Sequence, residues 1–161
     1  MTAVEPDDEV RSIAREYFGA PGDWGELVGG CGAEAVAKAG DRSFDLVVVD
    51  AADGGNAPPA ALSTPAFFAD VGRVLTEPAV LAVNVVARDA ETLARVRDAA
   101  ARVGGALFEC ELPAPLIAGG SSSNARLLFA VRGDALPSLA GHPLLAHVDE
   151  GEEWVQGFRR L

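Results

Sequence analysis

The stretch FDLVVVDAAD, residues 44–53, decides how the rest of the sequence is interpreted. Four aliphatic residues follow one another from position 46 to 49, and acids stand at positions 50 and 53. A β-branched run bounded by polar and glycine-rich sequence predicts a central parallel strand covered on both faces. Ligands of open α/β sheets bind at the carboxyl ends of such strands. Asp50 and Asp53 are therefore candidate functional residues.

Two interpretations of these acids stay open. A carboxylate at the end of a strand can accept hydrogen bonds from a hydroxyl or ammonium group, or take a proton from a nucleophile. Alternatively, Asp50 caps backbone amides and Asp53 is a turn residue before Gly54 and Gly55.

The composition indicates one acidic domain. The chain has 161 residues and a formal net charge of -11, and 49% of its residues are hydrophobic but only 6% aromatic. This length suffices for one core, filled mainly by small aliphatic side chains. Binding to nucleic acid requires clustered Lys and Arg, so we expect no nucleic-acid partner.

The sequence shows no secretion signal at its N-terminus and no membrane-spanning segment. The N-terminus lacks the pattern of a secretion signal, and no apolar run approaches the roughly 20 residues of a membrane helix. Cys31 and Cys110 do not form a disulfide framework. We therefore expect a cytoplasmic protein that makes no contact with a membrane.

Hydrophobic periodicity predicts that strands and helices alternate until the last part of the chain. The expected strands cover residues 2–5, 26–29, 44–50, 80–87, 106–112 and 125–132, and the expected helices 8–18, 33–39, 65–77, 90–103 and 152–160. The last two strands have no helix between them, which predicts an antiparallel hairpin. The fold class is α/β, with a Rossmann-like, mostly parallel sheet that ends in this hairpin. We assign residues 1–133 to the domain and residues 134–161 to its C-terminal extension.

Three segments resemble the class I S-adenosylmethionine-dependent methyltransferases, in particular the branch of the spermidine synthases and methyltransferase-like protein 13. Residues 44–54, FDLVVVDAADG, resemble the branch's Y-D-hydrophobic-D-x-x-D-x segment. Residues 59–88 resemble its Thr-x-x-Phe-Phe helix and the Gly-Val-Leu-x-x-Asn strand that follows. Residues 3–19, AVEPDDEVRSIAREYFG, resemble the acidic segment after its second strand. Together with NARLLFAVRG at 124–133, the resemblance covers roughly residues 2–133.

The resemblance implies a transferase that uses S-adenosylmethionine or decarboxylated S-adenosylmethionine. It would transfer a methyl or an aminopropyl group to the amine nitrogen of a small molecule or a protein. In this family Glu5 would bind the ribose hydroxyls of the cofactor. Asp50 would lie beside the amine-bearing end of the cofactor and the reacting amine, and Asp53 matches the second acid of the D-x-x-D pair.

The sequence departs from the family at two places. Cys31-Gly32 stands where the family has Asp-Gly or Asp-Ala, whose aspartate contacts the adenine amino group, and a thiol is a poor acceptor. The family's sheet order is 3-2-1-4-5-7-6, and its first strand and G-x-G-x-G loop precede the position of Glu5. We therefore expect an N-terminally truncated domain. The strands at 2–5 and 44–50 would then pair directly with each other, or the missing strand would come from another chain or from sequence upstream of Met1.

Two alternatives remain. The chain is a catalytically inactive binding or dimerisation module, which both departures favour. Or it binds a dinucleotide, because Gly30–Ala35 fits G-x-G-x-x-A and Asp50 lies 20 residues after Gly30. We expect no metal site, since His142 and His147 have no cysteines or paired acids beside them. Asn84 is unexplained, because a polar amide inside an apolar strand requires hydrogen-bond partners.

Overall fold

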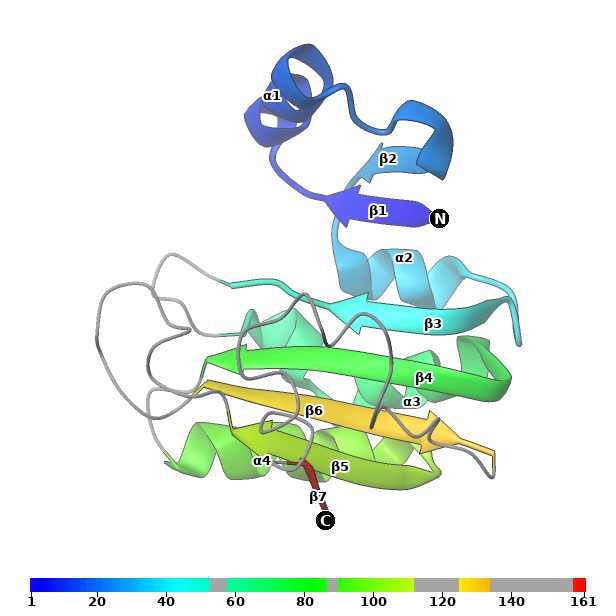
Figure 1. Ribbon diagram of the computed structural model, residues 1–161, viewed down its shortest axis with the longest axis vertical. Coiled ribbons are helices and arrows are strands. Elements are labelled where there is room, and N and C mark those ends of the chain that lie inside the picture. The colour runs from blue at the N-terminus through cyan, green and yellow to red at the C-terminus, as the bar shows by residue number, and fades with distance from the viewer. Residues whose placement is uncertain (53–57, 87–89, 112–124, 134–157) are drawn as a thin grey trace, which may run out of the picture. The chain divides into compact units, whose positions relative to one another are not determined.

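A computed structural model describes residues 1–52, 58–86, 90–111, 125–133 and 158–161. The chain divides into two compact units, residues 1–39 and residues 40–161. Each unit has its own hydrogen-bonded sheet (Figure 1).

The first unit contains a two-stranded parallel sheet, with helices after each strand. Its elements are β1 (Thr2–Glu5), α1 (Asp8–Phe18), a 3₁₀ turn (Gly22–Trp24), β2 (Glu26–Gly29) and α2 (Gly32–Lys38). The carboxylate of Asp7 accepts hydrogen bonds from the backbone amides of Glu9 and Val10, which caps α1 as the sequence predicts. Gly19 ends the helix in the left-handed conformation, at φ 64°.

The second unit is built on a five-stranded sheet in the order β3-β4-β6-β5-β7. Its elements are β3 (Phe44–Val49), a 3₁₀ turn (Ala60–Ser63), α3 (Pro65–Val74), β4 (Leu75–Val86), α4 (Ala90–Ala100), a second 3₁₀ turn (Ala101–Val103), β5 (Ala106–Glu111), β6 (Ala125–Arg132) and β7 (Phe158–Arg160). Strands β3, β4 and β5 run in one direction, and β6 and β7 in the other. The expected α/β class and the antiparallel β5–β6 hairpin are confirmed.

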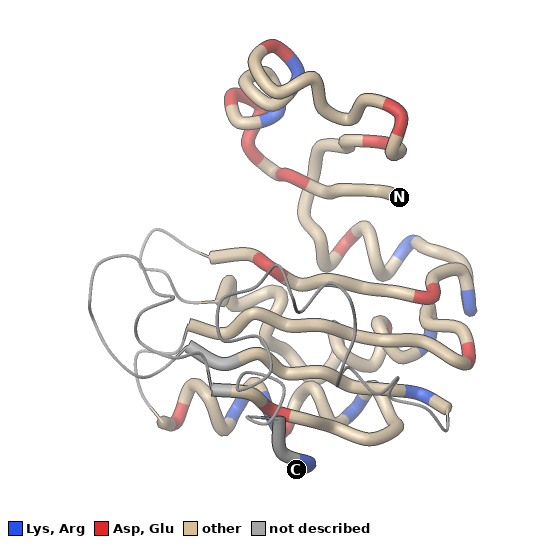
Figure 2. Tube along the Cα trace, viewed as in Figure 1, with Lys and Arg blue, Asp and Glu red and all other residues tan. Residues whose placement is uncertain are grey.

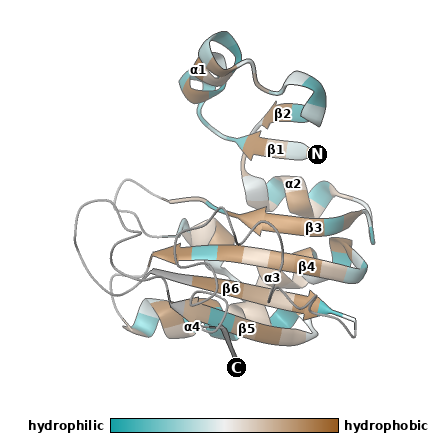
Figure 3. Cartoon of the chain, viewed as in Figure 1, coloured by the Kyte–Doolittle hydropathy of each residue, from teal (hydrophilic) through white to brown (hydrophobic). Residues whose placement is uncertain are grey.

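The core of the second unit lies between one face of this sheet and the helices α3 and α4, which lie behind the sheet in Figure 1. Every second residue of β4 from Ala79 to Val85 is buried on that face, while the residues between them are partly exposed. This alternation follows from the two-residue period of a strand. Figure 3 shows β4 hydrophobic along its middle, with a hydrophilic stretch towards its carboxyl end.

The sequence misjudges three local features. β3 is an edge strand of its sheet, and Leu46 and Val48 are 54% and 61% exposed, so the prediction of a strand covered on both faces is wrong. An apolar run identifies a strand but carries no information on what covers each face. The helix predicted to continue to residue 77 ends at Val74, and Leu75 begins β4, five residues before the predicted start of that strand.

The third feature is the C-terminus. Residues 158–160 form β7, which pairs antiparallel with β5, so the predicted helix over 152–160 is wrong in its last turn. Hydrogen bonds to a neighbouring strand are a tertiary effect that the local helical pattern does not contain. The rest of that predicted helix and the C-terminal extension at 134–157 lie outside the described residues, so the division at residue 133 stays a prediction.

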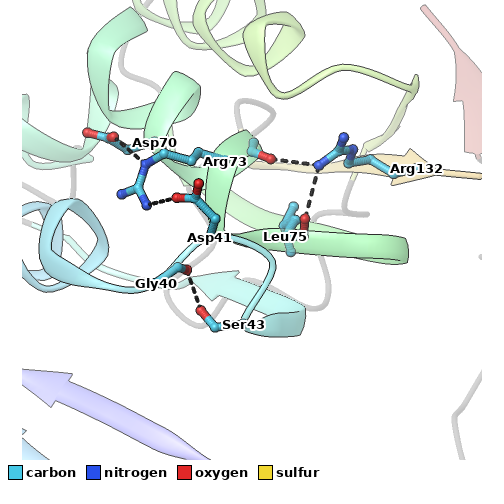
Figure 4. A network of polar contacts seen from close by, with 8 residues as sticks. Gly40, Asp41, Ser43, Asp70, Arg73, Leu75 and Arg132 are labelled. Carbon is cyan, nitrogen blue, oxygen red and sulfur yellow. Dashed lines mark hydrogen bonds and ion pairs between the residues drawn. The ribbon is translucent and has the colours of Figure 1, made fainter.

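A polar network joins α3 to the loop before β3 (Figure 4). Arg73 donates hydrogen bonds to Asp41 at 2.7 Å and to Asp70 at 3.3 Å, and the bond to Asp41 is the main cause of the raised pKa of Arg73. Arg132 of β6 donates to the backbone carbonyls of Gly72 and Leu75, at 2.6 and 3.1 Å. These bonds satisfy carbonyls that the end of a helix leaves free, and so fix α3 against the amino-terminal ends of β3 and β4.

A second contact fixes α4. The guanidinium of Arg97 makes a bidentate ion pair with the carboxylate of Glu109 on β5. The side chain of Glu109 is 1% exposed. A buried carboxylate is stable only when it is paired and hydrogen-bonded. The contact therefore specifies which face of the helix meets the sheet.

We expect Glu109→Gln to lower the free energy of unfolding by about 3 kcal/mol, because the substitution replaces the buried carboxylate by a neutral amide and leaves the partly exposed guanidinium of Arg97 without its ion-pair partner. Asp45→Asn makes the same chemical change at an exposed site on β3 and should change stability by less than about 0.5 kcal/mol. Urea unfolding followed by circular dichroism measures both. Equal effects of the two substitutions would contradict a stabilising role of the buried pair.

Candidate functional site

The register of two parallel strands brings Asp50 beside Asn84. Val48 and Val49 of β3 pair with Ala82 and Val83 of β4, so the next position on each strand lies side by side. The side-chain amide of Asn84 donates a hydrogen bond from Nδ2 to Oδ1 of Asp50, at 2.9 Å. The two side chains thus meet at the carboxyl ends of β3 and β4, where open α/β sheets bind ligands.

The two side chains differ in their exposure. Asp50 is exposed and Asn84 is half-buried. Oδ1 of Asn84 is buried and has no hydrogen-bond partner among the described residues. Figure 2 shows acidic positions near both ends of β3, whereas β4 between its ends carries little charge. An exposed carboxylate therefore lies next to a half-buried amide at this end of the described sheet.

The alternative interpretation of Asp50 as a backbone cap finds no support in the described part of the chain. Its recorded hydrogen bond comes from the side chain of Asn84, not from a backbone amide. Asp53 lies outside the described residues, so its role as a second site acid, or as a turn residue, stays a prediction.

The first unit positions the other expected site residues. Glu5 ends β1 and pairs in register with Gly29, which ends β2. Glu5 is half-buried, and its Oε1 accepts a hydrogen bond from the backbone amide of Asp7 at 2.9 Å. Cys31 and Gly32, at the start of α2, follow Gly29 by two and three residues. The structure therefore brings Glu5, Cys31 and Gly32 to the same end of one small sheet.

Glu5 and Asp50 belong to different units and to separate hydrogen-bonded sheets. In the described residues β1 pairs with β2 and β3 pairs with β4, so β1 and β3 do not pair directly with each other. A crevice shared by the two acids stays a prediction.

Comparisons with known proteins give a consistent result at the level of the fold. No family model matches the sequence, and no curated protein matches it. Among solved structures, the chain is similar to a probable spermidine synthase from Corynebacterium glutamicum, with 17% identity, a TM-score of 0.70 and 96% of this chain covered. It is also similar to spermidine synthase from Thermotoga maritima, with 22% identity, a TM-score of 0.67 and 82% of this chain covered. The chain has the class I methyltransferase fold.

A third similar structure is human methyltransferase-like protein 13 in complex with SAH, at 21% identity and a TM-score of 0.66 over 96% of this chain. The chain spans 59% and 45% of the two spermidine synthase chains and 70% of the human chain. The observed order β3-β4-β6-β5 follows the 4-5-7-6 part of the family's sheet, and the pair β1-β2 follows its strands 2 and 3. The resemblance inferred from the sequence is therefore confirmed for the fold.

The dinucleotide interpretation is not favoured. It requires the strand before Gly30 to lie next to the strand that ends at Asp50. In the described sheets these strands, β2 and β3, are not paired.

The described residues contain no group of three or more potential metal ligands, and none of their helices has the length and apolarity of a membrane span. His142 and His147 lie outside the described part of the chain.

Sequence reasoning identifies Asp50 but not its contact with Asn84. The signal is present in the sequence as one amide in an otherwise apolar strand. Its partner becomes evident only with the register of β3 on β4, which no local pattern specifies.

If Asp50 is a ligand-binding residue and not a structural cap, then Asp50→Asn changes the free energy of unfolding by less than about 1 kcal/mol, because both the carboxylate and its hydrogen bond are exposed. Thermal and urea unfolding of the variant and the wild-type chain measure this. A loss of several kcal/mol would instead identify Asp50 as part of the folding core.

Proposed function

We propose that the chain binds S-adenosylmethionine, or its decarboxylated form, and takes part in transferring a methyl or aminopropyl group to an amine nitrogen. The observation that carries the proposal is the exposed carboxylate of Asp50 at the carboxyl end of β3, oriented by the amide of Asn84 in a class I methyltransferase fold. Two of the similar structures are described as complexes with SAH and with the transition-state analogue AdoDATO.

Glu5 is proposed to hold the ribose of the cofactor. Its Oε1 is already bonded to the backbone of Asp7, which fixes the carboxylate at the end of β1. Its second oxygen accepts no recorded hydrogen bond within the described residues. A carboxylate in this place accepts hydroxyl donors well. Gly32, at the start of α2, is proposed to lie beside the adenine. Cys31 fits less well, because a thiol accepts poorly from an adenine amino group.

Asp50 is proposed to bind the reacting amine. The cofactor supplies an electrophilic carbon on a sulfonium, and the nitrogen must be neutral when it attacks. A carboxylate within hydrogen-bond reach can orient the amine and accept its proton. The hydrogen bond from Asn84 uses one lone pair of Oδ1 of Asp50, so Oδ2 and the second lone pair of Oδ1 can accept from the amine. Asp53 is proposed as the second acid of this subsite.

We expect Glu5→Gln to weaken binding of S-adenosylhomocysteine or of decarboxylated S-adenosylmethionine by about tenfold or more, because a charge-assisted hydrogen bond to the ribose is lost. Glu9→Gln, an exposed acid in the first turn of α1, is the matched control and should bind as the wild type does. Isothermal titration calorimetry measures all three proteins. If the wild-type chain binds neither cofactor, the proposed function fails and a non-enzymatic binding module is favoured.

We expect Asp50→Asn to reduce the rate of transfer to a diamine by about 100-fold or more, because the variant cannot accept a proton, while cofactor affinity stays within about threefold. Product formation from each cofactor is measured by mass spectrometry, which also separates methyl from aminopropyl transfer. Asp45→Asn on the same strand is the control and should keep the wild-type rate. Unchanged turnover in Asp50→Asn would remove Asp50 from the mechanism.

A binding or dimerisation module is the alternative function, and the similarity to spermidine synthases and methyltransferases does not favour it. The edges of β1 and β3 present backbone groups that a strand of a second copy or of another protein could pair with.

A further inference from the structure

We infer that two copies of this chain associate through β3, whose outer edge pairs antiparallel with the same strand of the second copy, centred on Val47. The two five-stranded sheets then form one continuous sheet around a twofold axis. This association is independent of the proposed function, because it concerns an edge of the sheet and not the groups proposed to bind the cofactor or the amine.

The edge formed by β3 lacks the features that protect edge strands. In the described residues β3 pairs with β4 on one side only (Figure 1). Natural edge strands are commonly kept from pairing with other chains by being very short, by charged side chains, especially lysine, or by proline. β3 has six residues with neither lysine nor proline, and Asp45 is its single charged residue.

The opposite edge of the same sheet has this protection. β7 is three residues long, and two of them are arginines. The strand order places β7 and β3 at the two ends of the sheet. One edge is therefore short and charged, whereas the other is an apolar strand of twice the length, the kind of edge to which a strand of another chain adds.

Two exposed side chains of β3 supply an apolar contact for the second strand. Leu46 and Val48 are both more than half exposed. They are two residues apart, so they lie on the same face of the strand. A neighbouring strand with apolar residues at the facing positions would remove both side chains from water, which favours association.

The sequence of β3 is complementary to itself. A twofold axis perpendicular to the sheet keeps the helix-covered faces of both copies on the same side. With this axis at Val47, Leu46 of each copy lies opposite Val48 of the other, and the four side chains lie on one face. With the axis at Val48, Leu46 would instead face the carboxylate of Asp50.

The ends of the strand favour the same register. With the axis at Val47, Phe44 of each copy lies opposite Asp50 of the other, and no acid of residues 44–50 faces another acid. Like charges directly opposite each other destabilise a strand pair. With the axis at Leu46, Asp50 would face Arg42, whose φ of 50° turns the chain out of the strand.

Net charge opposes this association and gives a way to recognise it. Each copy carries a formal net charge of -11. Two such chains repel each other, and the range of this repulsion falls from about 30 Å at 0.01 M salt to about 10 Å at 0.1 M. The dimer should therefore become stronger as salt is added, whereas a contact held by ion pairs would become weaker.

Sedimentation velocity of the full chain over a range of concentrations and salt tests the contact. We expect the wild type to shift from monomer to dimer, and Val48→Lys to raise the dissociation constant of the dimer by at least about tenfold. Ile13→Lys adds the same charge at another exposed apolar residue, on α1, and should dimerise as the wild type does. Circular dichroism of both variants should match that of the wild type, because both side chains are exposed.

Cysteine cross-linking tests the register, in a chain that carries Cys31→Ser. Cys110 is fully buried and stays. On oxidation, Leu46→Cys mixed with Val48→Cys should form a disulfide-linked heterodimer, because facing residues of an antiparallel pair have Cα atoms about 4.5–5.5 Å apart. Each variant alone should form at least about tenfold less linked dimer, since each cysteine is offset by two residues from its counterpart in the other copy.

Three results would overturn the inference. The first is a wild-type chain that stays monomeric at every salt concentration up to its solubility limit. The second is a dimer that Val48→Lys weakens no more than Ile13→Lys does, which would identify general apolar association or a contact through α1. The third is efficient cross-linking of Leu46→Cys or of Val48→Cys alone, which would identify a different register.

Discussion

The register of β3 on β4 is the constraint on which the site in the second unit depends. Val49 pairs with Val83, and this pairing sets Asp50 and Asn84 side by side on the same face of the sheet. A slip of one residue would turn Asn84 towards α3 and α4, where its amide would be buried in the core, and would separate it from the carboxylate. The hydrogen bond between the two side chains is therefore a consequence of strand pairing, and the apolar pattern of β4 maintains that pairing.

Contacts remote from the site hold this register in place. The helices α3 and α4 bury one face of the sheet. The alternate apolar residues of β4 must therefore face these helices, which fixes the face on which Asn84 lies. At the amino-terminal end of the strands, the backbone amide of Ser43 donates to the carbonyl of Val74 at 2.8 Å, and Arg73 and Arg132 bind the adjoining segments (Figure 4). The contacts that stabilise the sheet thus lie at the amino-terminal ends of the strands. The candidate site lies at their carboxyl ends, where open α/β sheets bind ligands.

Much of the fold could be predicted from the sequence, because its signals are local. The alternating apolar pattern, the cap at Asp7 and the Thr64-Pro65 start of α3 specify most elements to within a few residues. The C-terminal strand β7 could not be predicted, since it exists through its pairing with β5. The exposure of one face of β3 could not be predicted either. A run of apolar residues does not show how many strands pair with it or whether helices cover both of its faces.

The candidate site was only partly predictable for the same reason. The acid at the end of an apolar run identifies Asp50, and the residues around Glu5 identify the end of β1. The contact between Asp50 and Asn84 joins residues 34 positions apart in the chain. Such a contact follows from register and sheet order, which are properties of the assembled fold.

The position of β6 in the sheet sets an order of events during synthesis. β6 lies between β4 and β5 and pairs with both, although both precede it in the chain. Until the ribosome has released residues 125–132, β5 has neither of its neighbours and β4 has only β3. The β3–β4 pair can form early, but β5 joins the sheet only once β6 has been made, and β7 can pair with β5 only after that. Such long-range pairing slows folding and exposes nascent strand edges to other chains.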